Sequence, residues 1–457
     1  MTQTRIEKDS MGELQVPKNA LYGAQTQRAI QNFPMSGQRM PESFIRALIT
    51  VKKSAAMANM KLKTVDEERA QAIVNACDSL LSLDDVMQHF PVDIFQTGSG
   101  TSTNMNANEV IAKLASQEST QSVHPNDHVN YGQSSNDVIP TTIHVSAAIA
   151  LNTHLIPAVD RLIGIIEEKA DAVSVYCKTG RTHLMDAMPV KMDQSLNAWA
   201  AQLTQQRQTL TGLQSAITQL AQGGTAVGTG INAHPEFASA FAEALTVLTD
   251  IPFTPADNFF ALISSQDTAV TLSGAIKSLA VTMMKIANDL RWMNSGPLAG
   301  LGEITLPALQ PGSSIMPGKV NPVIPEAVTM ACAQVIGNDT AITIGGQSGN
   351  FELNVMLPMI ATNLLSSLNL MANSATLLGE QAIKGFTVNQ QNLEAALYRN
   401  PVLVTALNTV IGYAKAAEIA KKAYQENKPV LDVAEAMTDI PREELAALLD
   451  PKKLTSN

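Results

Sequence analysis

Two segments in the middle of the chain carry apolar residues at the spacing of long helices. In one of them the spacing alternates between four and three residues, at Leu272, Ile276, Leu279, Met283, Ile286, Leu290 and Met293. In the other the spacing is 4-4-3-4, at Leu151, Leu155, Val159, Leu162 and Ile166. Such a seam keeps one face of a helix apolar over several turns, so it requires another helix to cover it. The sequence therefore predicts a mainly α fold of long helices packed on helices.

The chain of 457 residues is too long for one simple core, and we predict three domains. Residues 1–133 form a mixed, mostly helical domain, residues 134–390 a bundle of long helices, and residues 391–457 a small helical domain. Hydrophobic residues make up 45% of the chain but aromatic residues only 4%. Helices rich in Ala and Met pack closely on several neighbours, which favours a bundle that extends across subunits.

Shorter patterns predict individual helices and loops. Helices are expected at 43–60, 67–81 and 358–378, the last with a proline in its first turn. Segments rich in Gly, Ser, Thr and Asn predict loops at 96–108 and 124–137. Each of these loops is expected to end where a helix starts, near Asn108 and Val138.

Charge and cysteine usage exclude several classes of function. The net charge is −10, from 31 basic and 41 acidic residues, so the chain has no general attraction for nucleic acid or anionic membranes. Cys77, Cys177 and Cys332 are odd in number and far apart, which disfavours a disulfide framework or a metal site. The N-terminus has no apolar run, and no segment approaches a clean 18-residue apolar span. We therefore expect a soluble, cytoplasmic protein.

The loop at 312–322 combines two glycines, two prolines, two serines, a lysine and an asparagine. Backbone N–H groups in such a loop can converge on an anion. A P-loop has four residues between its first glycine and the Gly-Lys pair, followed by Ser or Thr. Here five residues separate Gly312 from Gly318, and Val320 follows Lys319. The loop therefore predicts a site for an anion other than a nucleotide phosphate.

Three further polar clusters lie at 97–106, 132–137 and 180–187. In isolation the first two are read more readily as helix caps, and a lone histidine such as His183 as a surface residue. Glu326 follows the anion loop and is a potential partner for His183 in proton transfer. The clusters contain hydroxyls, amides, a lysine and a histidine, but no nucleophile–base pair of the usual hydrolase kind. Together they predict addition or elimination next to a carboxylate.

Other polar residues fit structural roles better. The glycine-rich stretch at 223–230 lacks the βαβ context of a dinucleotide loop, so we interpret it as a tight chain passage near a site. His89, His144 and His154 have no partners at the spacing of metal ligands.

These motifs, taken in order, resemble the fumarase/aspartase superfamily, and within it the class II, iron-independent fumarases. The loop at 312–322 is similar to the superfamily's signature loop. The resemblance covers essentially the whole chain, through 5–9, 21–28, 98–109, 124–137, 180–189, 223–232 and 351–355.

The resemblance implies a three-domain, fumarase/aspartase-like fold and a homotetramer whose central helices form a 20-helix bundle. It implies the reversible hydration of fumarate to (S)-malate in the tricarboxylic acid cycle, without metal or organic cofactor. Each active site takes residues from three subunits. One subunit contributes Ser99, Thr101, Ser134, Ser135 and Asn136, the second Thr182 and His183, and the third Ser313, Ser314, Lys319 and Asn321.

The resemblance also implies roles for these residues. Ser313 acts as an alkoxide-like base that removes the C3 proton of malate and leaves an aci-carboxylate, and Lys319 stabilises the charge. His183, paired with Glu326, handles the departing hydroxyl, although an alternative makes His183 the C3 base. A second dicarboxylate site matches at His124, Asn126 and Asp127, but Gln121 stands where the family often has arginine.

Two alternatives stay open. Aspartate ammonia-lyase shares the fold and the loop, but aspartases typically carry Gln at the position of His183 and Ala at that of Gly318. The stretch at 347–354 also follows the fumarase pattern. A non-catalytic, crystallin-like protein is the alternative of another class, and it would be expected to have lost site residues that are present here.

Overall fold

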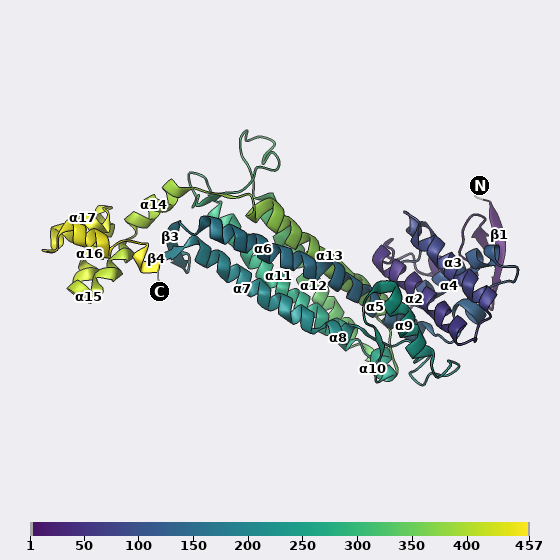
Figure 1. The fold of residues 1–457 in the computed structure, drawn as a ribbon. Helices are drawn as coiled ribbons and strands as arrows, with labels where there is room; N and C mark the ends of the chain where they lie inside the picture. The colour runs from purple at the N-terminus through teal and green to yellow at the C-terminus, as the bar shows by residue number, and fades with distance from the viewer. Residues whose placement is uncertain (1–2, 456–457) are drawn as a thin grey trace. The chain divides into compact units, whose positions relative to one another are not determined.

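The computed structural model describes residues 3–455, which are mostly helical (Figure 1). Its α-helices are α1 (Ala24–Asn32), α2 (Glu42–Lys61), α3 (Glu67–Leu81), α4 (Thr101–Glu118), α5 (Ser135–Ala150), α6 (Ile156–Val173), α7 (Met192–Gly212), α8 (Gln214–Ile217), α9 (Phe237–Thr249), α10 (Phe259–Ser264), α11 (Asp267–Met293), α12 (Val323–Gly346), α13 (Leu357–Leu377), α14 (Gln390–Arg399), α15 (Asn408–Ile411), α16 (Tyr413–Glu426), α17 (Val430–Met437) and α18 (Arg442–Leu448). Shorter 3₁₀ and π turns are η1 (Val86–His89), η2 (Pro125–Val129), η3 (Leu151–Leu155), η4 (Leu378–Ile383), η5 (Pro401–Leu407) and η6 (Lys453–Thr455).

The strands of the described residues pair two by two and connect helices rather than build a core. The antiparallel pairs are β1 (Thr4–Asp9) with β2 (Gly12–Pro17), β3 (Cys177–Thr182) with β4 (Met185–Lys191), β7 (Ile304–Thr305) with β10 (Thr387–Val388), and β8 (Gly349–Asn350) with β9 (Leu353–Asn354). One short parallel pair joins β5 (Gln219–Leu220) to β6 (Thr254–Pro255). The mainly α fold predicted from the sequence is confirmed.

The helices follow the predicted periodicity closely. All residues of both apolar seams are buried, those of the first along α11 and those of the second from η3 into α6. The predicted segments 43–60, 67–81 and 358–378 correspond to α2, α3 and α13. Pro358 lies in the first turn of α13, where its missing N–H leaves no helical bond unmade.

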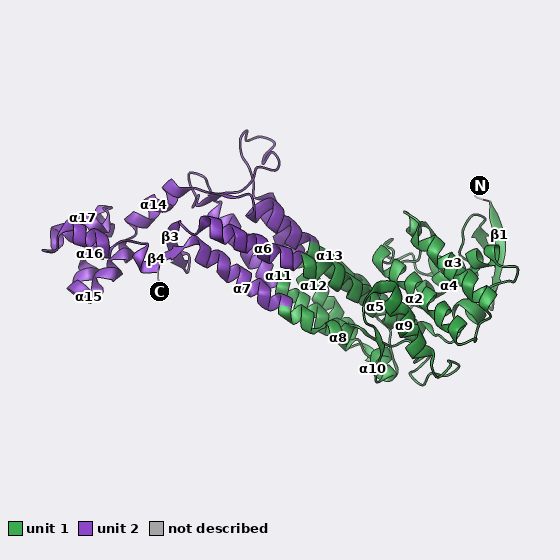
Figure 2. Ribbon diagram, viewed as in Figure 1, with its two compact units in different colours: residues 1–157, 208–280, 333–372 green, residues 158–207, 281–332, 373–457 purple. Residues whose placement is uncertain are grey.

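The described chain divides into two compact units (Figure 2). Unit 1 comprises 1–157, 208–280 and 333–372, and unit 2 comprises 158–207, 281–332 and 373–457. The division falls within the long helices α6, α7, α11, α12 and α13, which supply residues to both units.

In unit 1, α2 packs against α3, α5 and α9, and α4 packs against α3 and α5. Its segments of the long helices are joined by buried polar groups. Asp339 on α12 accepts hydrogen bonds from Ser273 Oγ at 2.8 Å and Lys277 Nζ at 2.5 Å, both on α11. Asn338 Nδ2 donates to Ser367 Oγ on α13 at 3.1 Å. Directional bonds of this kind fix which helix faces lie together.

In unit 2, the residues after η4 fold into a helical group with an apolar cluster of its own. The members of this cluster come from η5 and the helices α16, α17 and α18 and their flanks: Leu403, Val404, Leu407, Ala416, Ile419, Ala423, Val430, Val433, Ala434, Leu445 and Leu449. The three-domain division with boundaries at 133 and 390 stays a prediction.

The expectation about apolar spans is wrong. Two helical stretches, Ser135–Val173 and Asp267–Met293, are long and apolar enough to cross a membrane by length and composition. Both stretches meet this criterion because hydropathy is averaged along the helix, so the polar residues that interrupt the apolar run do not exclude them. Core helices of water-soluble proteins pass it too, and these stretches contain the two buried seams.

Candidate active site

The cluster at 97–106 lies at the start of α4 and is not the loop expected at 96–108. The helix begins at Thr101, and residues 103–108 are buried. Their amide and hydroxyl groups bond to other elements, which outweighs the weak helix propensity of Ser, Thr and Asn. At the N-terminus, Ser99 Oγ and Thr101 Oγ1 lie 2.8 Å apart, so one donates to the other. Two predicted substrate-binding hydroxyls therefore sit together at a helix N-terminus.

Gly98 explains how the chain enters this helix. A Cβ at position 98 would lie 1.8 Å from the carbonyl oxygen of Val355, so only glycine fits. Gly98 O accepts a hydrogen bond from Leu357 N at 3.0 Å. The contact places the residues before α13 against the α4 N-terminus. Part of the motif at 351–355 therefore shapes the backbone of this cluster.

The cluster at 132–137 caps α5, which begins at Ser135 rather than at Val138. Ser134 Oγ accepts from Asn136 N at 3.2 Å, and Asp137 Oδ1 accepts from Ser134 N at 2.9 Å, which completes a capping box. Ser134, Ser135 and Asn136 are half-buried. The capping role is therefore real, but it leaves the hydroxyl protons of Ser134 and Ser135 unspent in the capping bonds.

The two helix N-termini are joined, because Asn104 Nδ2 on α4 donates to Ser135 Oγ on α5 at 2.9 Å. The structure thus brings together, within unit 1, the residues predicted to come from one subunit. Helix N-termini carry positive partial charge, and paired hydroxyls beside them suit a carboxylate.

The glycine-rich passage at 223–230, predicted as a tight chain passage, packs against the start of α5. Asp137 Oδ2 accepts from Gly223 N at 3.1 Å and Thr225 N at 2.8 Å. Asn136 Nδ2 donates to Ala226 O at 2.8 Å. The passage therefore positions Asn136 and shields Asp137 from solvent.

A buried lysine in this region was missed by the sequence reasoning. Lys52 on α2 is fully buried and donates to Asn130 Oδ1 at 2.8 Å and Gln133 Oε1 at 3.1 Å. Burial lowers the pKa of Lys52 to about 7, against the opposing effect of Asp137. Burial raises the pKa of Asp137 to about 6, against three backbone N–H donors and Lys52. The signal was present, since Lys52 lies four residues after Leu48 on the apolar face of α2.

His183 lies at the tip of the β3–β4 hairpin. Thr182 pairs with Met185, so His183 and Leu184 form a two-residue turn, with φ of 56° and 59°. Turns of this type match the twist of a hairpin but require left-handed backbone at both positions, which is uncommon for residues other than Gly, Asn and Asp. Thr182 and His183 are exposed. The turn therefore presents His183 at the exposed tip of the hairpin.

The base of this hairpin is held by a buried ion cluster. Glu303 accepts from Lys178 Nζ and Arg181 Nη1, each at 2.6 Å. The Glu303 carboxylate is buried, and both of its oxygens are engaged by cations on β3. The hairpin is therefore anchored two residues before His183, although its tip is exposed.

The loop at 312–322 closes on itself through Gly312. Gly312 N donates to Lys319 O at 2.8 Å, and Asn321 Nδ2 donates to Gly312 O at 2.7 Å. A Cβ at position 312 would lie 2.4 Å from Lys319 O. Asn321 therefore acts on the loop's backbone in this structure.

Ser313 accepts two backbone hydrogen bonds at the start of the loop. Its Oγ accepts from Ile315 N at 3.2 Å and Met316 N at 3.0 Å. Two N–H groups directed at one hydroxyl oxygen stabilise negative charge there. Ser314 and Lys319 are exposed.

His183 and the loop line different cavities of unit 2. Lys319, Asn321 and Glu326 line a cavity of about 880 Å³, and His183 lines one of about 630 Å³. Among residues 3–455, no hydrogen bond joins His183 to Ser313 or Glu326. One chain therefore does not assemble the predicted His183–Glu326 pair.

The predicted second site lies at the turn η2. His124 Nδ1 accepts from Asn126 N at 3.3 Å and Asp127 N at 3.2 Å, and all three residues are exposed. Gln121 Nε2 donates to Glu68 at 3.0 Å and does not extend this cluster. The cluster is a helix cap with an open face.

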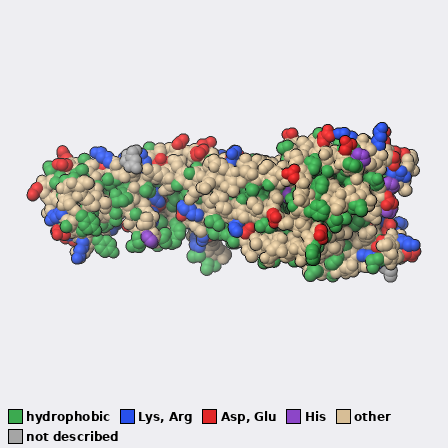
Figure 3. Space-filling model, turned by 90° about the horizontal axis from the view of Figure 1, so that it is seen from below, with side chains coloured by type: hydrophobic (Ala, Val, Ile, Leu, Met, Phe, Trp, Pro, Cys, Tyr) green, Lys and Arg blue, Asp and Glu red, His purple; other side chains and the backbone are tan. Residues whose placement is uncertain are grey.

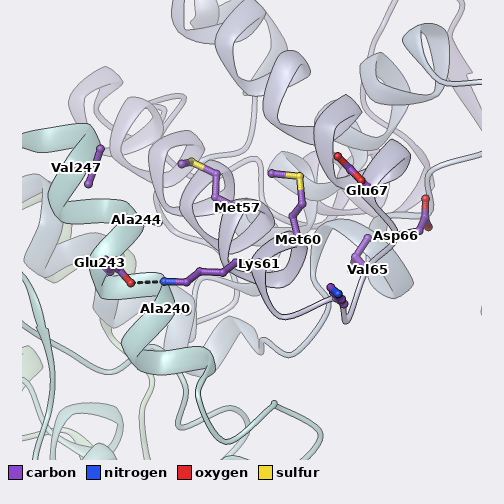
Figure 4. A pocket seen from close by; sticks show the side chains of 11 residues that line it. Met57, Met60, Lys61, Val65, Asp66, Glu67, Ala240, Glu243, Ala244 and Val247 are labelled. Atoms are coloured by element: carbon purple, nitrogen blue, oxygen red, sulfur yellow. Dashed lines mark hydrogen bonds and ion pairs between the residues drawn. The ribbon is translucent and has the colours of Figure 1, made fainter.

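A further cavity of about 700 Å³ in unit 1 lies between α2 and α9 (Figure 4). Met57, Met60 and Val247 give it apolar walls, and Lys61 pairs with Glu243 at 2.6 Å beside it. It contains no residue predicted for the site.

In the described part of the chain, no group of three or more His, Cys, Asp or Glu residues is placed to hold a metal ion. On the face in Figure 3, basic and acidic side chains are interspersed rather than gathered in a basic stripe.

Comparison with known proteins places the chain in a family. The family model described as "Lyase" matches residues 12–337, and that of the "Fumarase C C-terminus" matches 403–456. "Fumarate hydratase class II 2" of Pseudomonas aeruginosa is 64% identical over 456 residues, 100% of this chain and 99% of that one. The crystal structure of a class II fumarase from Schistosoma mansoni has a TM-score of 0.94 at 36% identity, covering 99% of both chains.

A structure described as a fumarate lyase:delta crystallin from Brucella melitensis, bound to cobalt, also has a TM-score of 0.94, at 41% identity and full coverage of both chains. Sequence and structural similarity thus extend over the whole length of the chain. The chain belongs to the class II fumarases of the fumarase/aspartase superfamily.

Proposed function

We propose that this protein is a lyase that catalyses the reversible hydration of fumarate to (S)-malate. The observation that carries the proposal is the full-length similarity to a relative named as a class II fumarate hydratase, 64% identical. A place in the cytoplasm and in the tricarboxylic acid cycle, and a reaction without metal or organic cofactor, belong to the same proposal.

The N-termini of α4 and α5 are suited to hold one end of the substrate. Ser135 Oγ accepts a hydrogen bond from Asn104, and Ser134 Oγ accepts one from Asn136 N. A hydroxyl that accepts from the protein keeps its own proton for another acceptor. Both serines therefore have an O–H available for a carboxylate, and Ser99 and Thr101 add a further donor beside them.

The remaining residues come, in this proposal, from other subunits of a homotetramer with a central helical bundle. Thr182 and His183 belong to a second subunit, and Ser313, Ser314, Lys319 and Asn321 to a third. The exposure of apolar side chains beside these residues supports the assignment, since Leu184 is 63% exposed, Met185 70% and Ile315 83%. Exposed apolar side chains grouped around polar site residues favour an interface.

The chemistry follows from where charge develops. Removal of the malate C3 proton puts a second negative charge on the adjacent carboxyl group, and Lys319 is the cation of the anion loop. Ser313 is the favoured base, because two N–H groups stabilise an ionised Oγ. His183, paired with Glu326 of another subunit, protonates the departing hydroxyl directly or through water.

The test is a comparison of malate and aspartate as substrates for the purified, metal-stripped protein. Formation of fumarate is followed by its ultraviolet absorbance. We expect fumarate from malate and none from aspartate. Fumarate from aspartate alone would assign an aspartate ammonia-lyase, and no turnover of either would favour the crystallin-like alternative.

A further inference from the structure

Lys52 is a buried lysine enclosed by amides next to the proposed carboxylate site. Its Nζ donates to the side-chain oxygens of Asn130 and Gln133. Whether protonated or neutral, the amine has at least two N–H donors, and groups that accept them must present oxygen. The lysine therefore determines which way these amides point.

The orientation of the Asn130 amide determines the orientation of the Asn104 amide through a series of hydrogen bonds. With Oδ1 turned to Lys52, Asn130 Nδ2 donates to Gln133 O at 3.1 Å. The same Oδ1 also accepts from Asn104 Nδ2 at 3.3 Å and Asn108 Nδ2 at 3.2 Å. Since Asn104 must turn its NH₂ group to Asn130, it presents that group to Ser135 as well.

This arrangement leaves two buried amide oxygens without hydrogen bonds. The oxygens Oδ1 of Asn104 and Asn108 are buried and have no hydrogen-bond partner among the described residues. A buried, unbonded oxygen costs free energy, and a flip of Asn104 would let its oxygen accept from the Ser135 hydroxyl. Another interaction must therefore hold the Asn104 amide in the orientation that leaves its oxygen unbonded. Lys52 is the donor at the other end of the series of hydrogen bonds that runs through Asn130.

We propose that Lys52 is a positioning residue for the hydration reaction, acting through Asn130 and Asn104 to keep the Ser135 O–H directed at the substrate carboxylate. The inference rests on the proposed function, which assigns Ser135 to the substrate. Without Lys52, the amides flip and Asn104 Oδ1 accepts a hydrogen bond from the Ser135 hydroxyl. The site then loses one hydrogen bond to a charged group.

The main test is Lys52→Met, which removes the charge and keeps an unbranched side chain of similar length. Loss of one hydrogen bond to a carboxylate predicts a KM for fumarate raised about 10-fold or more. The kcat changes little, because the bond holds substrate and transition state alike. Lys53→Met is the matched control, since Lys53 pairs with Asp78 and lies outside the network. It should leave both constants unchanged.

A double-mutant cycle separates positioning from general support of the fold. In a Ser135→Ala background, Lys52→Met should raise KM no further, because the hydroxyl through which it acts is gone. An equal increase in both backgrounds, or no increase in either, would overturn the inference.

Asn104→Asp decides the matter if Lys52→Met does not fold. Aspartate at this position presents only acceptors to Ser135, so KM should rise although Lys52 is retained. An unchanged KM in this variant would also overturn the inference. Wild-type protein without malate–fumarate conversion would instead overturn the proposed function, which keeps the two failures distinct.

Discussion

Within unit 1, the hydroxyls at the N-termini of α4 and α5 are joined by hydrogen bonds to one another, to backbone N–H and to the buried amide of Asn104. In unit 2, His183 and Ser313 are carried by a hairpin and a loop that have anchored bases and exposed tips. Asn104 joins the first pair of helices, and Asp137 ties α5 to the glycine-rich passage. In contrast, Glu303 holds the hairpin below His183 and Gly312 closes the loop below Lys319.

The difference teaches which half of the site one chain can finish alone. A carboxylate is held by groups that must not move, and unit 1 supplies them with their orientations already set. Proton transfer needs groups from several directions, and unit 2 presents His183 on an exposed turn and Lys319 on an exposed loop. We infer that the exposed tips are completed by other copies of the chain.

The largest effect is expected at the tip of the hairpin. His183→Asn should lower kcat by at least about 100-fold, because a positioned acid–base group contributes 10²–10⁴-fold. His154→Asn, at another exposed histidine, is the control and should retain full activity. Steady-state kinetics in both directions provide the measurement. Near wild-type turnover of His183→Asn would show that His183 takes no part in the mechanism. The assignment of proton transfer to unit 2 would then lose its support.

The base of the hairpin gives the next effect. Glu303→Gln leaves the buried Lys178 and the partly buried Arg181 without a counter-charge, which should lower the free energy of unfolding by about 3 kcal/mol. In the exposed pair with Lys61, Glu243→Gln should cost less than about 1 kcal/mol. Denaturant unfolding of the two variants compares them directly. Equal stability would mean that the hairpin base is not anchored as described.

A buried histidine tests whether unit 1 is fixed along α5 as well as at its start. His144 Nδ1 lies 2.7 Å from Gln219 O, and burial lowers the pKa of His144 from 6.5 to about 4. Between these values the unfolded chain binds the proton and the folded chain does not, so stability falls as the pH drops from 6.5 to 4.

Over that range the loss should reach about 3 kcal/mol per chain, since one pKa unit corresponds to about 1.4 kcal/mol. His144→Gln cannot take up a proton and should show a smaller loss. Urea midpoints across this pH range, compared between variant and wild type, measure the difference. Parallel curves would show that His144 is not held neutral by the fold.

The smallest effect is expected at the exposed cluster in unit 1. His124→Ala should change kcat/KM by about 2-fold or less, because the cluster is open and Gln121 is engaged by Glu68. Saturation curves extended to high malate concentration would reveal a contribution from a second site. A large loss of activity would show that an exposed polar cluster can matter here without being part of the shared site.

Much of the fold follows from periodicity, because α2, α3, α11 and α13 carry their own apolar pattern. The start of α4 does not, since its helix is stabilised by bonds from Asn106 and Asn108 to distant segments. Residue types that prefer caps are read as a loop when those partners are unknown.

The candidate site shows the same limit. Its residues could be identified from motifs, because hydroxyls, a lysine and a histidine cluster at breaks in the pattern. Lys52 was overlooked because a lysine within a helix is usually exposed, although its place on the apolar face of α2 was a signal. Its amide partners could not be predicted, since they lie far along the chain. The hairpin around His183 was not predicted, since it depends on the pairing of β3 with β4, which the short polar strand β3 does not indicate by its sequence.

The central claim is that the site takes His183 and Ser313 from different subunits. Inactive Ser313→Ala and His183→Asn proteins are mixed in equal amounts, and subunit exchange is verified by mass spectrometry. Each site then draws both intact residues with a chance of one half times one half, so activity should return to about a quarter of the wild-type value. No recovery despite complete exchange would show that both residues act within one chain and would contradict the account.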